Sequence, residues 1–267
     1  MSRESTAFES IAGVYDHEFT WTSTGKLQRN IVWAYLQRHI PRRKIDILEI
    51  NCGTGEDAIW FAKKRHRVFA TDISGAMIMV AESKRIISGL SNLRFQRASF
   101  GELSKKMQGG TFDLVFSNFG GINCVNRAEL MKLAGTLDRM LKPGGRLIMV
   151  IMGRKCAWER WFFFRRGEKQ KMFRRLAPSG VLASIGGEEI IINYYSPSEV
   201  RAIFHSQFRT VRLKPVGLFL PPSYLEPYFR KRKWLLKVLS GLEWAFGWIP
   251  RFSDRADHYI IEMEKRD

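Results

Sequence analysis

The stretch IDILEINCGTGEDAIWFA, residues 45–62, decides how the rest of the chain is interpreted. A short apolar run ends at Glu49, a loop of small residues follows over residues 51–55, and Asp57 opens a run with helical character. Glycines let a ligand approach the backbone closely, and the start of a helix offers unpaired N–H groups. The order of strand, loop and helix therefore predicts a site for a nucleotide-type cofactor.

A second apolar run, residues 68–71, ends at Asp72, where an acidic side chain suits a ribose with two free hydroxyls. The pattern of strand and helix then continues along the chain. We expect strands over residues 45–50, 66–72, 93–96, 112–118, 146–151, 208–213 and 258–263, with helices at 27–40, after Ser74, at 128–141 and at 196–204. This alternation predicts a largely parallel sheet covered by helices on both faces.

A chain of 267 residues suits one domain that carries an insertion. The regular alternation stops after the fifth predicted strand and resumes at the capping box Ser196-Pro197-Ser198-Glu199. We therefore divide a single domain into N-terminal cap helices (1–40), a cofactor-binding half (41–152), a lid or substrate insertion (153–195) and a C-terminal half with a basic aromatic helix (196–267).

The net charge of +18 and the isoelectric point near 10.1 indicate an anionic partner, either a membrane surface or a nucleic acid, although a merely basic surface remains an alternative. Cys52, Cys124 and Cys156 form neither a metal-ligand pair nor a disulfide pattern. The start, MSRESTAFES, lacks the apolar core of a signal peptide, and no apolar run is long enough to span a bilayer. We expect a metal-free cytoplasmic protein, with the inner face of the membrane as a candidate location.

Four landmarks in order resemble the class I S-adenosylmethionine-dependent methyltransferases of small-molecule type. They are the loop at residues 49–55, Asp72, the strand at residues 112–118, and Leu141-Lys142-Pro143-Gly144-Gly145. The resemblance covers residues 8–151 well and the remainder more loosely. It implies a Rossmann-like, doubly wound α/β fold with a seven-stranded, mostly parallel sheet whose last strand is antiparallel. An N-terminal helical cap and an insertion after strand 5 complete the expected architecture.

The resemblance also implies S-adenosyl-L-methionine as cofactor, S-adenosyl-L-homocysteine as product, and a set of binding residues. Glu49 would lie near the methionyl amine, Gly53 and Gly55 would let the backbone pass under the cofactor, and Asp72 would take both ribose hydroxyls. The other expected cofactor-binding residues are Tyr15, Asn51, Ile73, Met77, Ser99, Phe100, Asn118 and Phe119.

Two positions depart from the family pattern. Asn51 replaces the first glycine of the loop, and Asn tolerates the left-handed backbone region better than other non-glycine residues. Ser99 replaces the acidic residue that holds the adenine amino group, although its hydroxyl can still accept a hydrogen bond.

The catalytic candidates are His17, at the end of the first helix, and Tyr195, just before the resumed helix. His17 is the first choice for a base, with a surface or capping histidine as its alternative. Tyr195 is the second choice, with a pocket wall as its alternative. His205 and His258 are interpreted as ordinary core or strand residues.

Two segments, residues 153–175 and 219–248, interleave aromatic side chains with Lys and Arg. Such a mixture suits a helix lying on an anionic membrane, whereas a lid over the pocket and a packed helix with a solvated basic end are the alternatives.

We expect O-methylation of a small hydrophobic or amphipathic acceptor, such as a phenol, a quinone precursor, a polyene or an acyl-type metabolite. An RNA methyltransferase and a non-catalytic cofactor-binding protein are the competing hypotheses. The sequence does not specify the oligomeric state.

Overall fold

The computed structural model describes residues 3–107, 111–229 and 231–266, and its centre is a seven-stranded sheet. Met1 and Ser2 of the predicted cap and Arg230 of the second basic aromatic segment lie outside these residues. The order across the sheet is β3-β2-β1-β4-β5-β9-β8. The strands are β1 (Asp46–Ile50), β2 (Arg67–Asp72), β3 (Leu93–Arg97), β4 (Phe112–Ser117), β5 (Leu141–Met152), β8 (Phe208–Val216) and β9 (His258–Lys265).

Strands β1 to β5 pair in parallel, whereas β9 runs antiparallel to both of its neighbours, β5 and β8. The predicted α/β fold, with a seven-stranded, mostly parallel sheet, is therefore confirmed. The predicted fifth strand begins five residues too late, at Arg146 rather than Leu141. The turn Pro143-Gly144-Gly145 lies inside β5, where the register with β4 shifts between Phe112 and Leu114.

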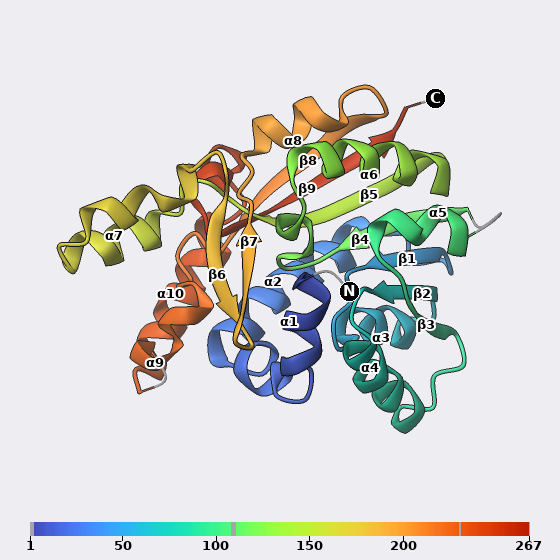
Figure 1. Ribbon diagram of the computed structural model, residues 1–267, viewed down its shortest axis with the longest axis horizontal. Helices are drawn as coiled ribbons and strands as arrows, with labels where there is room; N and C mark the ends of the chain where they lie inside the picture. Colours follow the sequence, from blue (N-terminus) through green and yellow to red (C-terminus); the bar gives the residue numbers. More distant parts are fainter. Residues whose placement is uncertain (1–2, 108–110, 230, 267) are drawn as a thin grey trace.

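Helices cover both faces of the sheet, and alternate residues along each strand supply the two cores (Figure 1). Ile47 packs on the side of α2 and α3, for example, while Leu48 packs on the side of α6 and α8. The helices are α2 (Ser23–His39), α3 (Glu56–Lys63), α4 (Gly75–Ile87), α5 (Leu103–Lys106), α6 (Arg127–Met140) and α8 (Pro197–Phe204). The predicted caps at Ser74 and Ser196 are both present, so local sequence sets where these helices begin.

The N-terminal segment folds over the carboxyl ends of the parallel strands. Helix α1 (Arg3–Ile11) is followed by a π-helical turn (Asp16–Thr20), and Tyr15 lies between them rather than in α1. Glu9 caps α4, because its carboxylate accepts the backbone N–H groups of Gly75 and Ala76 at 2.7 and 2.8 Å. This contact fixes α1 against the cofactor-binding half.

Two excursions from the sheet lie on the same side of the molecule (Figure 1). The first contains α7 (Ala157–Arg165), a 3-10 segment (Lys169–Leu176) and the hairpin of β6 (Val181–Ile185) and β7 (Glu188–Ile192). The second joins β8 to β9 and contains α9 (Glu226–Phe229) and α10 (Lys233–Phe246). Within the described residues, no helix is long and apolar enough to cross a membrane.

Candidate active site

The loop after β1 has the backbone that its sequence predicts. Asn51, Gly53 and Gly55 all have positive φ, at 52°, 53° and 81°. A side chain at Gly55 would also collide, because a Cβ there would lie 2.7 Å from the ring of Phe95. A Cβ at Gly53 would meet no atom within 4 Å, so that side of the loop is open. The loop is therefore closed toward the core and accessible toward a ligand.

Asp72 ties the ends of the first two strands together. Its Oδ2 accepts the backbone N–H of Gly53 at 2.8 Å, and its Oδ1 accepts that of Ser74 at 3.0 Å. Burial raises the pKa of Asp72 and these N–H groups act in the opposite direction. Each carboxylate oxygen keeps a further acceptor site, as pairing with two ribose hydroxyls requires.

Glu49 is one of the buried polar residues whose hydrogen bonding the protein leaves incomplete. Its side chain is at the carboxyl end of β1, the residue is 1% exposed, and Oε2 has no hydrogen-bond partner among the described residues. Burial, with the nearby charge of Asp57, raises the pKa of Glu49 well above its usual range. An ammonium group brought to Oε2, such as the amine of S-adenosylmethionine, would satisfy this carboxylate, although Glu49 lies behind the cavity wall rather than in its lining.

Asn51 joins the loop to the end of β4. Its Nδ2 donates to the backbone carbonyl of Asn118 at 2.8 Å, and its Oδ1 accepts the hydroxyl of Ser117 at 2.6 Å. A Cβ at Gly121 would lie 2.2 Å from the Asn51 side chain, so a glycine is required there. Asn51, which stands where the family has its first glycine, thus adds hydrogen bonds that connect the ends of β1 and β4.

Asn118 anchors the turn after β4 from behind. Its Nδ2 donates to Asp57 at 2.8 Å, and its Oδ1 accepts the backbone N–H of Phe119 at 3.0 Å. Asp57 also accepts the indole N–H of Trp33 at 2.6 Å and pairs with Arg29. Phe119 has a φ of 36°, so its ring is held at the site by a strained backbone.

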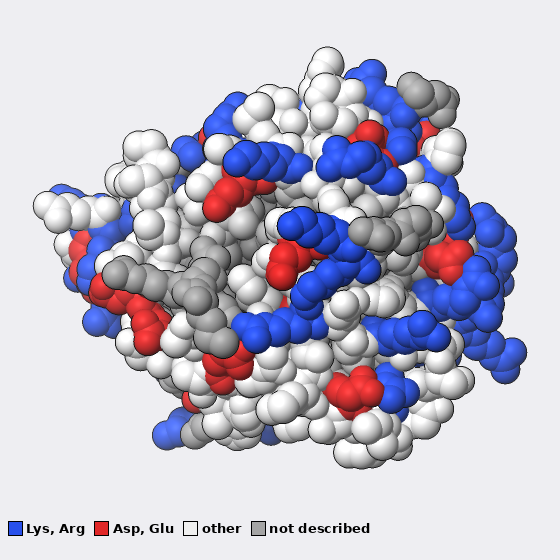
Figure 2. All heavy atoms as spheres, turned by 45° about the vertical axis from the view of Figure 1, so that its right-hand side comes forward, with Lys and Arg blue, Asp and Glu red and all other residues white. Residues whose placement is uncertain are grey.

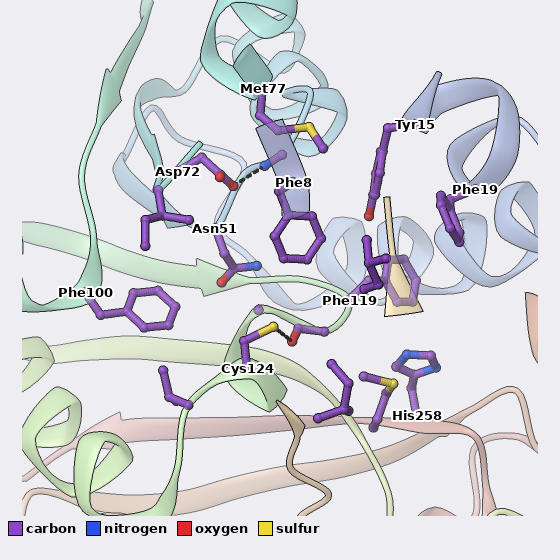
Figure 3. Close-up of a pocket in the computed structure, with 18 of the residues that line it drawn as sticks. Phe8, Tyr15, Phe19, Asn51, Asp72, Met77, Phe100, Phe119, Cys124 and His258 are labelled. Atoms are coloured by element: carbon purple, nitrogen blue, oxygen red, sulfur yellow. Dashed lines mark hydrogen bonds between the residues drawn. The ribbon is translucent and has the colours of Figure 1, made fainter. Parts of the chain in front are cut away.

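A cavity of about 590 Å³ opens beside these groups, within the size range of small-molecule sites. Of the residues predicted to bind the cofactor, Tyr15, Asn51, Gly53, Asp72, Ile73, Met77, Ser99, Phe100 and Phe119 line it, and Figure 3 shows several of them around one hollow. Glu49, Gly55 and Asn118 are not part of the lining. The Ser99 hydroxyl is engaged by Glu102 at 2.8 Å, in the capping box of the next turn.

The cavity continues past the loop into parts of the chain that the family pattern does not cover. This far half combines apolar side chains from the turn after β4, the end of β5 and the hairpin with polar and charged side chains from the two excursions and the start of β9. They include Cys124, Val125, Met152, Ile185, Ile192, Arg174, Arg175, Tyr194, Pro222, Tyr224 and His258. A small, largely apolar molecule with a polar group fits such a lining.

His258 is a site residue that the sequence analysis misses. It lines the cavity at the first residue of β9, and its ring meets that of Phe119 edge to face at 5.2 Å between centroids. Its Nδ1 lies 3.1 Å from Oδ2 of Asp257, and Asp257 also pairs with Arg175 at 2.7 Å. In the sequence, the signal for a site here is an acid next to a histidine at the start of a strand. Only the fold shows that Asp257 and His258 reach the cavity.

The structure does not bring the two predicted catalytic residues to the cavity. His17 is exposed on the turn after α1 and is not part of the lining. Tyr195 is buried against α6 and α8, and its hydroxyl donates to the carbonyl of Val125 at 2.6 Å. Its neighbour Tyr194 lines the cavity instead. The reason is local: the chain enters the core between Tyr194 and the cap at Ser196, so adjacent side chains point in different directions.

The aromatic residues of α7 do not line the cavity either. Phe163 is buried, Trp158 and Phe162 pack on the segment before α10, and Trp161 and Phe164 are exposed. Among the described residues, no group of three or more His, Cys, Asp and Glu side chains could hold a metal ion.

Comparison with known proteins agrees with this geometry. Residues 47–145 match the family model described as a methyltransferase domain. A demethylmenaquinone methyltransferase of Clavibacter sepedonicus is 31% identical over 147 residues, which cover 54% of this chain and 56% of that protein. A tRNA 5-carboxymethoxyuridine methyltransferase of Escherichia coli is 26% identical over 147 residues, covering 54% and 55%. The chain thus spans about half the length of these two relatives.

The fold also matches solved structures. Magnesium protoporphyrin IX methyltransferase from Synechocystis, solved with bound S-adenosylhomocysteine, has a TM-score of 0.59 at 14% identity. The match covers 98% of this chain and 95% of that one. Residues 47–145 are therefore a methyltransferase domain, and the fold agrees with that of the class I S-adenosylmethionine-dependent methyltransferases that the sequence resembles. S-adenosylmethionine is the methyl donor of this class, and Glu49, Asp72 and the loop fit it.

Proposed function

We propose that the protein transfers a methyl group from S-adenosylmethionine to a hydroxyl oxygen of a small, largely apolar acceptor. The observation that carries this proposal is one continuous cavity, with the glycine loop at one end and His258 at the other. The domain match ends at residue 145, so most of the acceptor half comes from residues outside it.

The donor half of the cavity has three tasks. Glu49 would bind the amine, Asp72 the ribose hydroxyls, and Ile73 and Phe100 the adenine. When bound, the cofactor supplies an electrophilic methyl group on a sulfonium, so the protein chiefly aligns the reactants and excludes water. Tyr15 and Phe19 on the N-terminal cap line the cavity with their ring centroids 5.1 Å apart. They support the exclusion of water because they close this part of the cavity wall.

The acceptor half of the cavity would hold the apolar body of the substrate. One of its side chains would take the hydroxyl proton of the acceptor. In the transfer, an O–C bond forms while an S–C bond breaks, the electron pair of the broken bond stays on sulfur, and the hydroxyl proton leaves. His258 is the group that we assign to this proton, because it lines the cavity and imidazole is the side chain that most often serves as a general base. The Asp257 carboxylate lies 3.1 Å from Nδ1 of this ring, which leaves Nε2 as the nitrogen that would take the proton.

RNA methylation is the second candidate. The tRNA-modifying relative and the net charge of +18 favour it. The predominantly apolar lining of the cavity as a whole favours the small molecule. We further propose a cytoplasmic protein at a membrane surface, because three cysteines without a disulfide pattern suit a reducing compartment.

Isotope-labelled S-adenosylmethionine tests the proposal. The protein is incubated with an organic extract of cellular lipids or with bulk tRNA, and the label is then followed into each fraction. We expect label in the extract, none in tRNA, and loss of transfer in Asp72→Ala. Label in tRNA alone would replace the proposal with RNA methylation. Binding of S-adenosylhomocysteine without transfer to either fraction would leave a non-catalytic binding protein.

A further inference from the structure

One surface of the protein exposes an unusual number of large aromatic side chains. They come from α7, the 3-10 segment after it, and the segment from Ser223 to the start of α10. We call this surface the aromatic face; it consists of Trp161, Phe164, Phe173, Tyr224, Tyr228 and Trp234. Trp161 and Trp234 are 56% and 69% exposed. Contiguous exposed apolar surface of this kind marks an interaction site rather than chance exposure.

The two segments that supply the aromatic face are packed on each other, so the face is one surface. The ring of Trp158 lies 5.8 Å from that of Phe229, and the ring of Phe162 lies 6.0 Å from those of Tyr224 and Tyr228. In Figure 1, α7, α9 and α10 accordingly project together from the same side of the sheet. Residues about seventy positions apart therefore act as one unit.

Helix α10 is apolar on two opposite sides. Its inner side packs through Leu236 and Leu239, and the buried carboxylate of Glu243 accepts backbone N–H groups of Gly217 and Phe219 at 3.0 and 2.6 Å. These contacts fix the helix, so its outer residues Trp234 and Val238 cannot turn inward. A helix with an apolar outer side must meet an apolar surface or leave that area in water.

Exposed cations accompany the aromatic face. Arg165 and Lys169 lie at the end of and after α7, and Lys233 and Lys237 lie beside Trp234 and Val238 on α10. In the described part of the chain, no carboxylate forms an ion pair with these four side chains. Aromatic rings at headgroup level with Lys and Arg around them are the pattern of helices that lie on anionic bilayers.

The aromatic face reaches the acceptor half of the cavity. Tyr224 is 41% exposed on the face and also lines the cavity, and its hydroxyl donates to Glu159 at 3.2 Å. Arg174, on the 3-10 segment, lines the cavity and pairs with the same Glu159 at 2.9 Å. A molecule leaving a bilayer at this face would therefore meet the acceptor half of the site directly.

We propose that the aromatic face docks the protein on an anionic lipid bilayer, and that the acceptor is an amphipathic molecule dissolved in that bilayer. Only the statement about the acceptor rests on the proposed methyl transfer. The docking itself follows from the exposed rings, the fixed outer side of α10 and the accompanying cations. We expect the rings to enter the headgroup region while the sheet and the cofactor half remain in water.

Positive charge alone does not define this face. Figure 2, which brings the right-hand side of Figure 1 forward, shows Lys and Arg side chains spread over that part of the surface with Asp and Glu between them. The aromatic face differs because its cations stand among exposed rings and aliphatic side chains such as Val238 and Leu176. Stacking platforms for single-stranded RNA need rings in a basic groove, but not an aliphatic surface.

Vesicle flotation measures the docking, with phosphatidylcholine vesicles with and without phosphatidylglycerol. We expect the wild type to float with the anionic vesicles only. The variant Trp161→Ser/Trp234→Ser should lose most of this binding, and Arg165→Glu/Lys233→Glu/Lys237→Glu should reduce the partition coefficient about a hundredfold or more. The matched controls are Ile86→Ser/Ile87→Ser on α4 and Arg42→Glu/Arg43→Glu before β1, which change equally exposed side chains elsewhere and should float normally.

Binding of S-adenosylhomocysteine, measured by calorimetry without vesicles, should be equal in all these variants and shows that each is folded. Flotation that is absent in the wild type, or unchanged in the face variants, would overturn the proposal. Failure of flotation together with RNA binding that the charge reversals abolish would assign the face to RNA. Failure together with a dimer that Trp234→Ser dissociates would assign it to a second copy of the chain. Normal flotation without methyl transfer would instead contradict the proposed function.

Discussion

Nδ1 of His258 lies 3.1 Å from Oδ2 of Asp257 at the point where the last strand enters the sheet. Burial alone would raise the pKa of Asp257, but the adjacent His258 and the guanidinium of Arg175 hold that pKa well below its usual range. The carboxylate therefore stays charged at neutral pH, and the imidazole that we assign as the base lies directly beside it.

Replacing His258 tests this assignment. We expect His258→Ala to lower kcat by about 10²–10⁴-fold, the usual contribution of a general base. The affinity for S-adenosylhomocysteine should stay unchanged, because no predicted donor contact involves this side chain. His205→Ala, at an exposed histidine after α8, is the control. Label transfer and calorimetry measure the two quantities, and a fully active His258→Ala protein would exclude the base assignment.

Glu49 provides a prediction on stability and binding together. Burial raises its pKa well above the usual range, so the folded state holds a proton that the unfolded state has released above about pH 4.3. The stability of the cofactor-free protein should therefore decrease as the pH rises from that value toward the folded-state pKa. Glu49→Gln should remove this part of the decrease and weaken S-adenosylhomocysteine binding about tenfold to a hundredfold. Urea unfolding at several pH values and calorimetry check both effects, and identical pH dependence in both proteins would refute the first.

Two substitutions at the loop residue Asn51 distinguish the contribution of its hydrogen bonds from the cost of its backbone conformation. Both Asn51→Gly and Asn51→Ala lose the contacts with Ser117 and Asn118, which should cost about 1–2 kcal/mol. Only alanine must also adopt a φ near 52°, so it should be less stable than the glycine variant by about 1 kcal/mol. Urea unfolding measures the difference. Equal stability of the two variants would mean that the backbone at residue 51 relaxes.

Tyr15 yields a prediction about pH. Burial raises its pKa to about 12, partly offset by the charge of Arg29, so its phenol stays protonated throughout the neutral range. It can donate a hydrogen bond there but cannot serve as the base. We expect the rate of Tyr15→Phe to follow the same pH profile as the wild type between about pH 6 and 9, even if its absolute rate is lower. If the wild-type rate rises with pH and the rate of Tyr15→Phe does not, Tyr15 is the titrating group.

Local sequence was sufficient for the cofactor half. The alternation of apolar runs predicts the strands, the caps at Ser74 and Ser196 predict two helix starts, and Asn51 suits the left-handed backbone that it adopts. These features depend on neighbours in the chain, because strand ends, caps and turns are decided within a few residues. The order of the landmarks therefore predicts the class of protein before any contact between distant residues is known.

The acceptor half depended on contacts between distant residues. His258 looks like an ordinary strand residue until the antiparallel β9 places its first residue beside Phe119. Tyr195 and His17 resemble site residues in sequence but lie in the core and at the surface, respectively. The Rossmann-like sheet and the cofactor loop are predictable from the sequence, because both follow from periodicity and local backbone preference. Which side chains enclose the acceptor depends on the fold, because two excursions encoded far apart in the chain pack over one end of the sheet.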